Sequence, residues 1–332
     1  MPDPIDLAAE ARAFMRSRVL LTAAELDIFT WLDGRDATAA EIARGLDADQ
    51  RALTRLLDVL VGIGLLSKRN GRYANSEGAG VLSERNPNSV RASMLHQVRL
   101  WKTWSALTDV VRTGTPPDRA PAEEDPGRTA AFIGAMENVA RRTAAGIAAA
   151  YDAARFSHLL DIGAGPGSYA IAFLNRHPGL RATLFDLPEV IELARENVGR
   201  AGLLDRVRFV AGDFYKDELP QGCDLALLSA IIHQNSPAQN LDLFTKAFRA
   251  LEPGGVLLIR DHVMDEDRVR PLGGAFFALN MLVNTRGGDT YTFEEVADGL
   301  AAAGFARPAL VQRGEMMDSL IEAGKAGARA RS

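Results

Sequence analysis

Cysteine is almost missing from this sequence, since Cys223 is the single one among 332 residues. A chain with one cysteine cannot form an intramolecular disulfide, which is typical of proteins kept in a reducing compartment. Long apolar runs are missing too, because no uncharged stretch approaches the roughly 18 to 20 residues that span a bilayer, and the first residues lack the basic and then apolar pattern of a signal peptide. We therefore expect a soluble, cytoplasmic protein with no membrane partner.

A strong excess of charge is also lacking. The formal net charge is -5 and the pI about 5.7, so the chain has no general attraction for phosphate backbones, and nucleic acid is not an expected partner. What is present is ordinary for a globular protein, with 47% hydrophobic and 24% charged residues. Because the chain of 332 residues is about twice the usual size of one domain, two domains are expected.

The first of these domains, residues 1–150, has the apolar periodicity of helices followed by a hairpin. Thr38 precedes Glu41 by three residues, which is the pattern of a capping box at a helix start. Asn70-Gly71 is a strong signal for the turn of a β-hairpin. Helices followed by such a hairpin are typical of a winged helix. The expected elements are helices at 7–32 (with one possible break), 38–46, 49–63, 90–111 and 128–150, a hairpin at 64–74, and a proline-rich loop at 115–126.

A winged helix can also belong to a DNA-binding regulator, in which residues 49–63 would enter the major groove. The segment from residue 35 to residue 85 carries eight basic and seven acidic side chains and is nearly neutral. Its would-be recognition helix offers Arg51 and Arg55 among apolar residues, which describes a packing face. DNA binding is therefore the lesser alternative.

From residue 151 to residue 332, segments typical of strands alternate with segments typical of helices. This alternation implies a mostly parallel sheet covered by helices on both faces. We predict the α/β class, with a doubly wound, mostly parallel, seven-stranded Rossmann-like sheet behind an N-terminal, all-helical, winged-helix-like domain. The strands are expected at 158–162, 182–187, 207–211, 225–230, 256–261, near 309 and at 319–322, and the helices at 168–175, 190–201, 238–251 and 293–303.

The first strand runs into a glycine-rich turn, Gly163-Ala-Gly-Pro-Gly167, and then into a helix. Such a turn lets a ligand approach the backbone and the free N–H groups of the helix, although a tight turn without a ligand has the same composition. Asp186 ends the next strand, about twenty residues on, where it can accept hydrogen bonds from both hydroxyls of a ribose. A G-x-G-x-x-G dinucleotide fingerprint needs a small third residue at Ser168, whereas the third glycine is Gly167, so the spacing argues against a nicotinamide cofactor.

The third strand ends in Gly212-Asp213-Phe214, where Asp213 can accept from an adenine amino group and Phe214 can pack on the ring. Together with Asp161-Ile-Gly-Ala-Gly-Pro-Gly, Phe185-Asp-Leu-Pro and Leu251-Glu-Pro-Gly-Gly, this motif makes the chain resemble the class I S-adenosylmethionine-dependent methyltransferases, and in detail the caffeate and hydroxyindole O-methyltransferase family. The resemblance covers nearly the whole chain. The positions that match the family's cofactor-binding residues are Asp161, Gly163, Gly165, Asp186, Leu187, Gly212, Asp213, Phe214 and Ser229.

The resemblance implies an enzyme that moves a methyl group from S-adenosylmethionine, without a metal, to a hydroxyl of a small aromatic or polyketide-like metabolite. It also implies a homodimer formed through the N-terminal domain. The family's catalytic base matches His233, whose imidazole takes the proton from the hydroxyl as the oxygen attacks the methyl group. Asp261 matches one of the two acidic residues that flank this base.

The sequence departs from the family around His233. The second acidic position falls on Thr290, and the aspartate and tryptophan that usually follow the histidine are replaced by Gln234 and Asn235. Three interpretations stay open: His233 is less basic than in the family, Asp289 substitutes for the missing carboxylate, or His233 positions the acceptor without taking its proton. Relatives that bind the same cofactor but catalyse another reaction, or none, are the second functional alternative.

The acceptor pocket is expected where family positions combine apolar and polar side chains. About half of the apolar members are expected to be ordinary core residues. The polar members suggest a flat acceptor that carries several hydroxyls or other heteroatoms, with oxygen favoured over nitrogen or carbon as the methylated atom. The matching positions are Leu95, His96, Trp104, Phe132, Met136, Phe277, Asn280, Met281 and Asn284.

Overall fold

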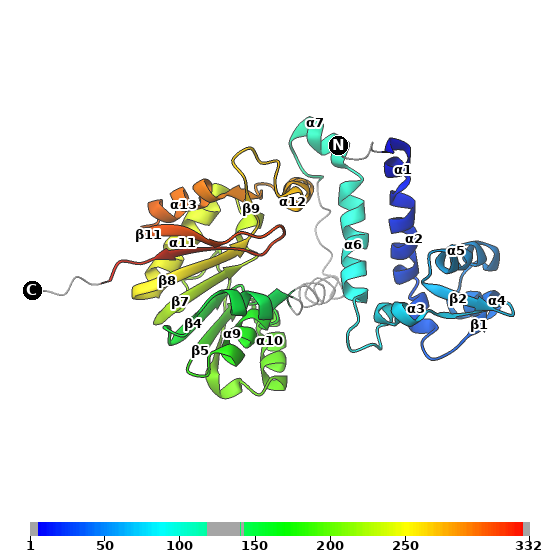
Figure 1. Cartoon of the computed structure of the whole chain (residues 1–332), viewed down its shortest axis with the longest axis horizontal. Helices are drawn as coiled ribbons and strands as arrows, with labels where there is room; N and C mark the ends of the chain where they lie inside the picture. Colours follow the sequence, from blue (N-terminus) through cyan, green and yellow to red (C-terminus); the bar gives the residue numbers. More distant parts are fainter. Residues whose placement is uncertain (1–5, 118–139, 141–142, 328–332) are drawn as a thin grey trace, which may run out of the picture. The chain divides into compact units, whose positions relative to one another are not determined.

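The computed structural model describes residues 6–117, 140 and 143–327. Two compact units are found among them, one formed by residues up to Lys102 and the other by residues from Thr103 onward (Figure 1). Helix α7 (Leu107–Thr113) and the helical residues 143–150 thus belong to the unit that contains the large sheet. The division predicted at residue 150 concerns functional domains and stays a prediction.

The N-terminal unit has the helices and the hairpin that the sequence predicts. The capping box is present, since the Glu41 amide donates to Thr38 Oγ1 over 3.3 Å and the Thr38 amide donates to Glu41 Oε2 over 2.7 Å. Asn70 and Gly71 form the hairpin turn with φ of +50° and +75°, as a type I′ turn requires. The elements are α1 (Leu7–Arg12), α2 (Phe14–Glu25), α3 (Ile28–Trp31), β1 (Ala37–Thr38), α4 (Ala39–Gly45), α5 (Gln50–Gly62), β2 (Leu66–Arg69), β3 (Arg72–Asn75), η1 (Glu77–Leu82) and α6 (Arg91–Trp104).

Two details of this unit differ from the sequence prediction. The helical stretch between residues 7 and 32 is interrupted twice rather than once, and the second break falls at Asp27, whose φ of +56° is left-handed and cannot continue a helix. Strand β1 pairs with β3 and adds a third strand to the hairpin. The core of the unit is formed by fully buried side chains such as Phe29, Leu57 and Tyr73.

The second unit is built on one seven-stranded sheet in the order β11-β12-β8-β7-β4-β5-β6 (Figure 1). Neighbours from β8 to β6 pair in parallel, whereas β12 is antiparallel to both β8 and β11. The predicted doubly wound, mostly parallel sheet is confirmed. Its strands are β4 (His158–Ile162), β5 (Arg181–Asp186), β6 (Val207–Ala211), β7 (Cys223–Ser229), β8 (Leu251–Asp261), β11 (Ala306–Gln312) and β12 (Ser319–Gly324), and a separate pair is formed by β9 (Val263–Met264) and β10 (Tyr291–Thr292).

The two faces of this sheet carry separate cores. Leu159 of β4 packs on one face with side chains of α9, whereas Leu160, next in the chain, packs on the other face with side chains of α11, as the two-residue period of a strand requires. The carboxyl ends of the parallel strands share one edge, where a doubly wound sheet binds its ligands. The helices of this unit besides α7 are α9 (Ser168–Arg176), α10 (Pro188–Arg200), η2 (Leu204–Arg206), η3 (Ile232–Gln234), α11 (Pro237–Ala250), α12 (Leu272–Asn284) and α13 (Phe293–Ala302).

Helix α12 was not among the predicted helices. It begins with Leu272 followed by Gly273 and Gly274, which are poor helix formers. A Cβ on Gly274 would lie 2.4 Å from Met264 Sδ, so close packing explains that glycine. In the part of the chain that the structure describes, no helix combines the length and the apolar composition needed to cross a membrane.

Candidate active site

The turn between β4 and α9 brings backbone, rather than side chains, to the edge of the sheet. Gly163 and Gly167 have φ of +68° and +79°, a region that favours glycine. A Cβ on Gly163 would lie 2.7 Å from Ile231 Cδ1 and 3.3 Å from the Phe214 ring. A Cβ on Gly165 would meet nothing within 4 Å, so the turn borders open space there. A ligand can therefore approach the main chain of this turn.

Replacing Gly163 by alanine is expected to destabilise the protein by about 1–3 kcal/mol, because the new Cβ is strained at positive φ and overlaps Ile231. Urea denaturation measures the loss. Gly165→Ala is the matched control, since φ there is +53° but no atom lies in the way. Equal losses in both variants would mean that backbone conformation, rather than close packing against Ile231, explains the glycine.

Asp186 lies beside this turn, at the end of β5. Its Oδ2 accepts from the Gly165 amide and its Oδ1 from the Leu187 amide, both over 2.7 Å. Burial raises the pKa of Asp186, and the two amide hydrogen bonds limit that rise. Each carboxylate oxygen still has a lone pair for another donor. The carboxylate is thus fixed where a ribose hydroxyl could reach it from the open side of the turn.

The end of β6 supplies the third side of the same edge. A Cβ on Gly212 would lie 2.5 Å from the Phe185 ring, so only glycine fits there. A hydrogen bond from Lys216 lowers the pKa of Asp213, which also accepts from the Tyr215 amide over 2.9 Å. Asp161, Asp186 and Asp213 lie at or just beyond the carboxyl ends of β4, β5 and β6, and the Phe214 ring lies next to Gly163. The predicted cofactor motifs of β4, β5 and β6 are therefore brought together.

Asp161 and Ser229 complete the predicted cofactor positions. Burial of Asp161, with a further contribution from the Asp186 charge, raises its pKa to about 7. Ser229, at the end of β7, accepts from Arg260 Nη1 over 3.2 Å. Sequence reasoning missed Arg260; the signal available was a lone arginine directly after the apolar run 256–259.

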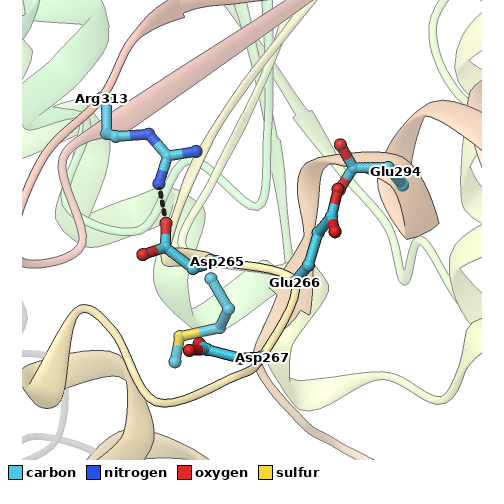
Figure 2. Close-up of a pocket in the computed structure, with 6 residues that line it drawn as sticks. Asp265, Glu266, Asp267, Glu294 and Arg313 are labelled. Carbon is cyan, nitrogen blue, oxygen red and sulfur yellow. Dashed lines mark hydrogen bonds and ion pairs between the residues drawn. The ribbon is translucent and has the colours of Figure 1, made fainter.

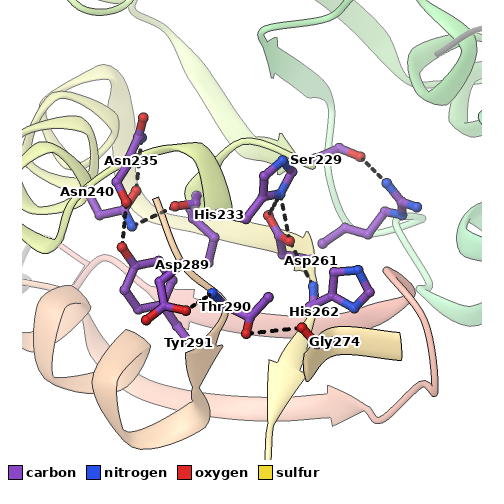
Figure 3. A network of polar contacts seen from close by, with 12 residues as sticks. Ser229, His233, Asn235, Asn240, Asp261, His262, Gly274, Asp289, Thr290 and Tyr291 are labelled. Carbon is purple, nitrogen blue, oxygen red and sulfur yellow. Dashed lines mark hydrogen bonds and ion pairs between the residues drawn. The ribbon is translucent and has the colours of Figure 1, made fainter. Parts of the chain in front are cut away.

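His233 and Asp261 form a buried pair at the same edge (Figure 3). His233 lies on η3, directly after β7, and Asp261 ends β8. The Nδ1 of His233 is 2.9 Å from both carboxylate oxygens of Asp261. Burial alone would raise the pKa of Asp261, but the His233 partner and the His262 amide outweigh it and hold the pKa below its usual value. The imidazole is thus oriented by a carboxylate that stays ionised.

Thr290 and Asp289 occupy the neighbourhood where the family has its second acidic residue. Thr290 is buried, and its hydroxyl donates to the Gly274 carbonyl over 3.4 Å. The carboxylate of Asp289 accepts from the Thr290 amide and contacts Arg268, whereas its own amide donates to the His233 carbonyl over 2.9 Å (Figure 3). The contact between Asp289 and His233 therefore runs through the main chain, not through the carboxylate.

Asn235 replaces a bulky residue of the family and has a structural role. It is fully buried; its Nδ2 donates to Asn240 Oδ1 over 3.0 Å, and its Oδ1 accepts from the Tyr215 hydroxyl over 2.6 Å. The Tyr291 hydroxyl donates to the Asn235 carbonyl. These contacts tie the segment after His233 to three other parts of the unit, a function that no sequence pattern indicated.

The predicted acceptor residues are only partly brought together. On α12, the edge of Phe277 faces His233, with ring centroids 4.8 Å apart, and Met281 is buried. Trp104 Nε1 donates to Asn280 Oδ1 over 3.0 Å, and Asn284 Nδ2 donates to the same oxygen over 3.0 Å. The expectation that these amides need a ligand as partner is weakened, because they bond to each other and to Trp104.

The other predicted acceptor residues belong to the N-terminal unit or lie outside the described residues. Leu95 and His96 are half-buried on α6, in the N-terminal unit, where burial and then Arg99 lower the pKa of His96. Phe132 and Met136 lie outside the described residues. All of these positions stay predictions.

One hollow in the second unit is lined by residues other than those predicted for the site. Figure 2 shows its acidic lining, in which Asp265 is paired with Arg313. The cavity measures about 440 Å³, and none of the predicted site residues lines it. Nor do the described residues contain a cluster of His, Cys, Asp and Glu side chains able to hold a metal ion. The lining residues are Met264, Asp265, Glu266, Asp267, Glu294 and Arg313.

Comparison with known proteins shows which family the chain belongs to. A family model described as the O-methyltransferase domain matches residues 104–306, and one described as the O-methyltransferase dimerisation domain matches residues 10–85. The chain belongs to the O-methyltransferase family. Tetracenomycin polyketide synthesis 8-O-methyl transferase TcmO of Streptomyces glaucescens is 34% identical to this methyltransferase over 312 residues, which are 91% of each chain.

Two further comparisons agree. The 3-hydroxy-5-methyl-1-naphthoate 3-O-methyltransferase of Streptomyces sahachiroi is 33% identical over 91% of this methyltransferase and 89% of the relative. The crystal structure of human N-acetylserotonin methyltransferase in complex with S-adenosylmethionine superposes with a TM-score of 0.83 at 29% identity, over 98% and 100% of the two chains. The predicted family, fold class and enzyme class are confirmed: the methyltransferase is S-adenosylmethionine-dependent and acts on oxygen.

Proposed function

We propose that this methyltransferase methylates a hydroxyl of an aromatic, polyketide-like metabolite, with His233 as the general base. The observation that carries the proposal is the contact of His233 Nδ1 with both oxygens of Asp261 at 2.9 Å. A histidine held in this way has one nitrogen committed to the carboxylate and the other available for a substrate proton.

The residues at the sheet edge fit the nucleoside part of the cofactor. The open space over Gly165 and the half-buried carboxylate of Asp186 suit a ribose, and Asp213 with Phe214 suits an adenine ring. S-Adenosylmethionine supplies, when bound, an electrophilic methyl group on a sulfonium. No metal is needed for the proton transfer assigned to His233.

The proton moves through His233 Nε2. Because Nδ1–H donates to Asp261, the neutral imidazole carries its lone pair on Nε2. This nitrogen takes the hydroxyl proton as the acceptor oxygen attacks the methyl group, whose bond to sulfur breaks with both electrons staying on the sulfur, so that S-adenosylhomocysteine would leave. The ionised carboxylate of Asp261 stabilises the resulting imidazolium. Phe277 packs against the imidazole, which limits the access of water to the pair. The proton then leaves Nε2 to solvent, so that the base is regenerated.

The acceptor class follows from the relatives and from α12. TcmO is named for an 8-O-methyl transfer in polyketide synthesis, and the second relative for the 3-hydroxyl of a naphthoate. Phe277, which packs against the His233 ring, offers an apolar side chain beside the proposed base on which a flat ring can pack.

A product assay tests this proposal. We expect label from methyl-labelled S-adenosylmethionine to appear in the ethers of hydroxynaphthoates or hydroxyanthraquinones, and not in products of aliphatic alcohols or amines of similar size. Preferential methylation of amines would contradict the acceptor class. Tight binding of S-adenosylhomocysteine without label transfer to any phenol would favour the alternative suggested by Thr290, a cofactor-binding relative without transferase activity.

We also propose that the N-terminal unit makes the methyltransferase a homodimer. The dimerisation-domain match covers residues 10–85, and Phe14 and Met15 on α2 are 50% and 53% exposed in the single chain. Apolar side chains exposed side by side favour an interface between copies. Light scattering should give about twice the chain mass of 35.8 kDa, and Phe14→Glu should shift the mass toward that of one chain. A monomer at all micromolar concentrations would contradict the proposal.

A further inference from the structure

One buried imidazole close to the proposed base lacks a hydrogen-bond partner. His262 directly follows Asp261, the last residue of β8, and is 3% exposed (Figure 3). Its amide donates to Asp261 Oδ1 over 2.8 Å, but within the described residues its Nδ1 has no partner. The other three histidines of this unit, His158, His177 and His233, each have a ring nitrogen within hydrogen-bond distance of a protein group. His262 is therefore the exception among them.

The surroundings of the His262 ring are apolar. Its centroid lies 4.8 Å from that of the Phe277 ring, at an interplanar angle of 35°. A Cβ on Gly274 would lie 3.6 Å from Nδ1, so this nitrogen lies beside a residue without a side chain. An apolar residue could pack here as well, and a buried polar atom left unpaired costs about 1–3 kcal/mol. An atom of this kind in a folded protein usually indicates a missing ligand or another specific function.

Phe277 connects His262 with the proposed base. The centroid of its ring lies 4.8 Å from the centroids of both imidazoles, that of His233 and that of His262. The predicted cofactor motifs lie at the ends of β4, β5 and β6, and β7 separates these strands from β8. The partner that His262 lacks is therefore expected from the acceptor, which must approach His233, rather than from the nucleoside of the cofactor.

The imidazole of His262 is neutral at pH 7. Burial lowers its pKa, and the Asp261 carboxylate opposes this shift without cancelling it. A neutral imidazole has one N–H donor and one lone pair, so it can donate to a carbonyl oxygen or bond in either direction to a hydroxyl. Either ring nitrogen can form the bond, because a half turn of the ring exchanges nitrogen and carbon positions. An uncharged oxygen is thus the complementary group.

We propose that His262 selects the acceptor by hydrogen bonding to a second oxygen, a hydroxyl or a carbonyl, on the same ring system as the hydroxyl whose proton His233 takes. The inference rests on the proposed function, since it assumes an aromatic acceptor beside His233. It adds a specificity-determining residue to that function. Two hydrogen bonds to one flat acceptor also orient its ring, so that one hydroxyl among several is presented to the methyl group.

His262 differs in this respect from the polar residues predicted on α12. Asn280 Oδ1 accepts from both Trp104 Nε1 and Asn284 Nδ2, each over 3.0 Å. An acceptor oxygen at His262 satisfies a nitrogen that is otherwise unpaired, whereas a donor that approaches Asn280 Oδ1 meets an atom that already accepts two hydrogen bonds. An acceptor with only one oxygen leaves the His262 imidazole unpaired and should bind less tightly.

Acceptor binding to the complex with S-adenosylhomocysteine tests the proposal. 2-Naphthol carries one hydroxyl, and the dihydroxynaphthalenes that contain it add a second one at different ring positions. In isothermal titration calorimetry we expect the wild type to bind at least one of these dihydroxynaphthalenes about 5- to 50-fold more tightly than 2-naphthol, the range for satisfying a buried polar atom. In His262→Phe the same ratio should fall below about twofold, because a phenyl ring forms no such hydrogen bond.

Two further variants complete the experiment. His262→Gln keeps a donor and an acceptor and should recover part of the preference. His158→Phe is the matched control, since His158 is a half-buried histidine at the start of β4 that contacts Thr183, and it should retain the whole preference.

Nuclear magnetic resonance of the imidazole nitrogens gives a second readout, which remains if His262→Phe does not fold. The chain has five histidines, so the signals of His262 are assigned as those missing in His262→Gln. We expect them to shift when the preferred dihydroxynaphthalene binds, and to shift less with 2-naphthol. Signals that do not respond to the dihydroxynaphthalene, or that shift fully with S-adenosylhomocysteine alone, would overturn the proposal.

The binding outcomes separate this inference from the proposed function. S-Adenosylhomocysteine has no methyl group to transfer, so the affinities do not depend on catalysis. A preference that persists in His262→Phe, or no preference in the wild type, would overturn the role of His262 even if naphthols are methylated. A preference that depends on His262 would support that role, and the failure of every phenol in the product assay would then contradict the proposed O-methylation alone.

Discussion

Replacing His233 by alanine is expected to lower the rate of methyl transfer by about two to four orders of magnitude, which is the usual contribution of a positioned general base. The expectation rests on the 2.9 Å contacts to Asp261, which leave Nε2 free for the acceptor proton. Steady-state rates over a range of pH measure it.

The control separates catalysis from packing. His233→Ala should bind S-adenosylhomocysteine as the wild type does, because the sheet edge proposed to hold the nucleoside is formed by other residues. His177→Asn is the control for the loss of a histidine away from the proposed base, since His177 is a half-buried histidine at the end of α9. A His233→Ala variant that keeps more than a tenth of the rate would assign His233 a positioning role only.

Asp261→Asn should lower the rate by roughly two to four orders of magnitude, although the side chain keeps its shape. An amide that donates to Nδ1 would hold the imidazole in the wrong tautomer, with its proton on Nε2 facing the acceptor. Rates at saturating cofactor, compared with cofactor affinity, measure the effect: kcat should fall while the affinity for S-adenosylhomocysteine stays close to that of the wild type.

The same carboxylate also links stability to pH. Because the pKa of Asp261 is lowered in the folded protein, its contribution to stability is fully present above the unfolded value of about 3.9. That contribution is lost as the pH falls from the unfolded value through the lowered folded value. Urea denaturation between pH 3 and pH 6 should therefore show a steeper loss of stability on acidification in the wild type than in Asp261→Asn.

Asp289→Asn is the matched control for Asp261. It removes a carboxylate that is close in sequence to Thr290 but faces Arg268. A change of less than about threefold in kcat is expected, since its contact with His233 runs through the backbone. If Asp289→Asn were as damaging as Asp261→Asn, the carboxylate of Asp289 would have to substitute for the missing acidic residue after all.

Sequence reasoning predicted the sheet because the physical signals of its strands are local. The parallel strands are short apolar runs bounded by glycine, proline or aspartate, and they lie within one or two residues of the predicted positions, apart from the early start of β8 at Leu251. Capping residues such as Thr38 act on their own helix turn, so their effect also follows from nearby sequence. Helix α12 was missed because its glycines are explained by contacts with residues distant in the sequence: Gly274 packs against Met264, and Gly273 against Met316.

The site was predictable to the extent that it is made of strand ends. Carboxylates and glycines at the ends of adjacent parallel strands must meet at one edge, and the structure brings Gly163, Asp186 and Phe214 together there. Contacts across the sheet could not be predicted from spacing. The pairing of Trp104 with Asn280 joins residues 176 positions apart, and the position of Arg260 beside Tyr169 depends on how β8 and α9 pack.

The contacts around α12 have a consequence for how acceptor preference can change in evolution. Thr290 bonds to the first turn of α12, Asp289 to the main chain of His233, and Tyr291 to Asn235. None of these three contacts involves the side chain of Phe277, which packs against the His233 ring. On the proposed mechanism, new side chains at such positions of α12 can therefore be selected for a different ring system while the nitrogen that takes the proton keeps its place, so one scaffold can diversify over many metabolites without rebuilding its chemistry.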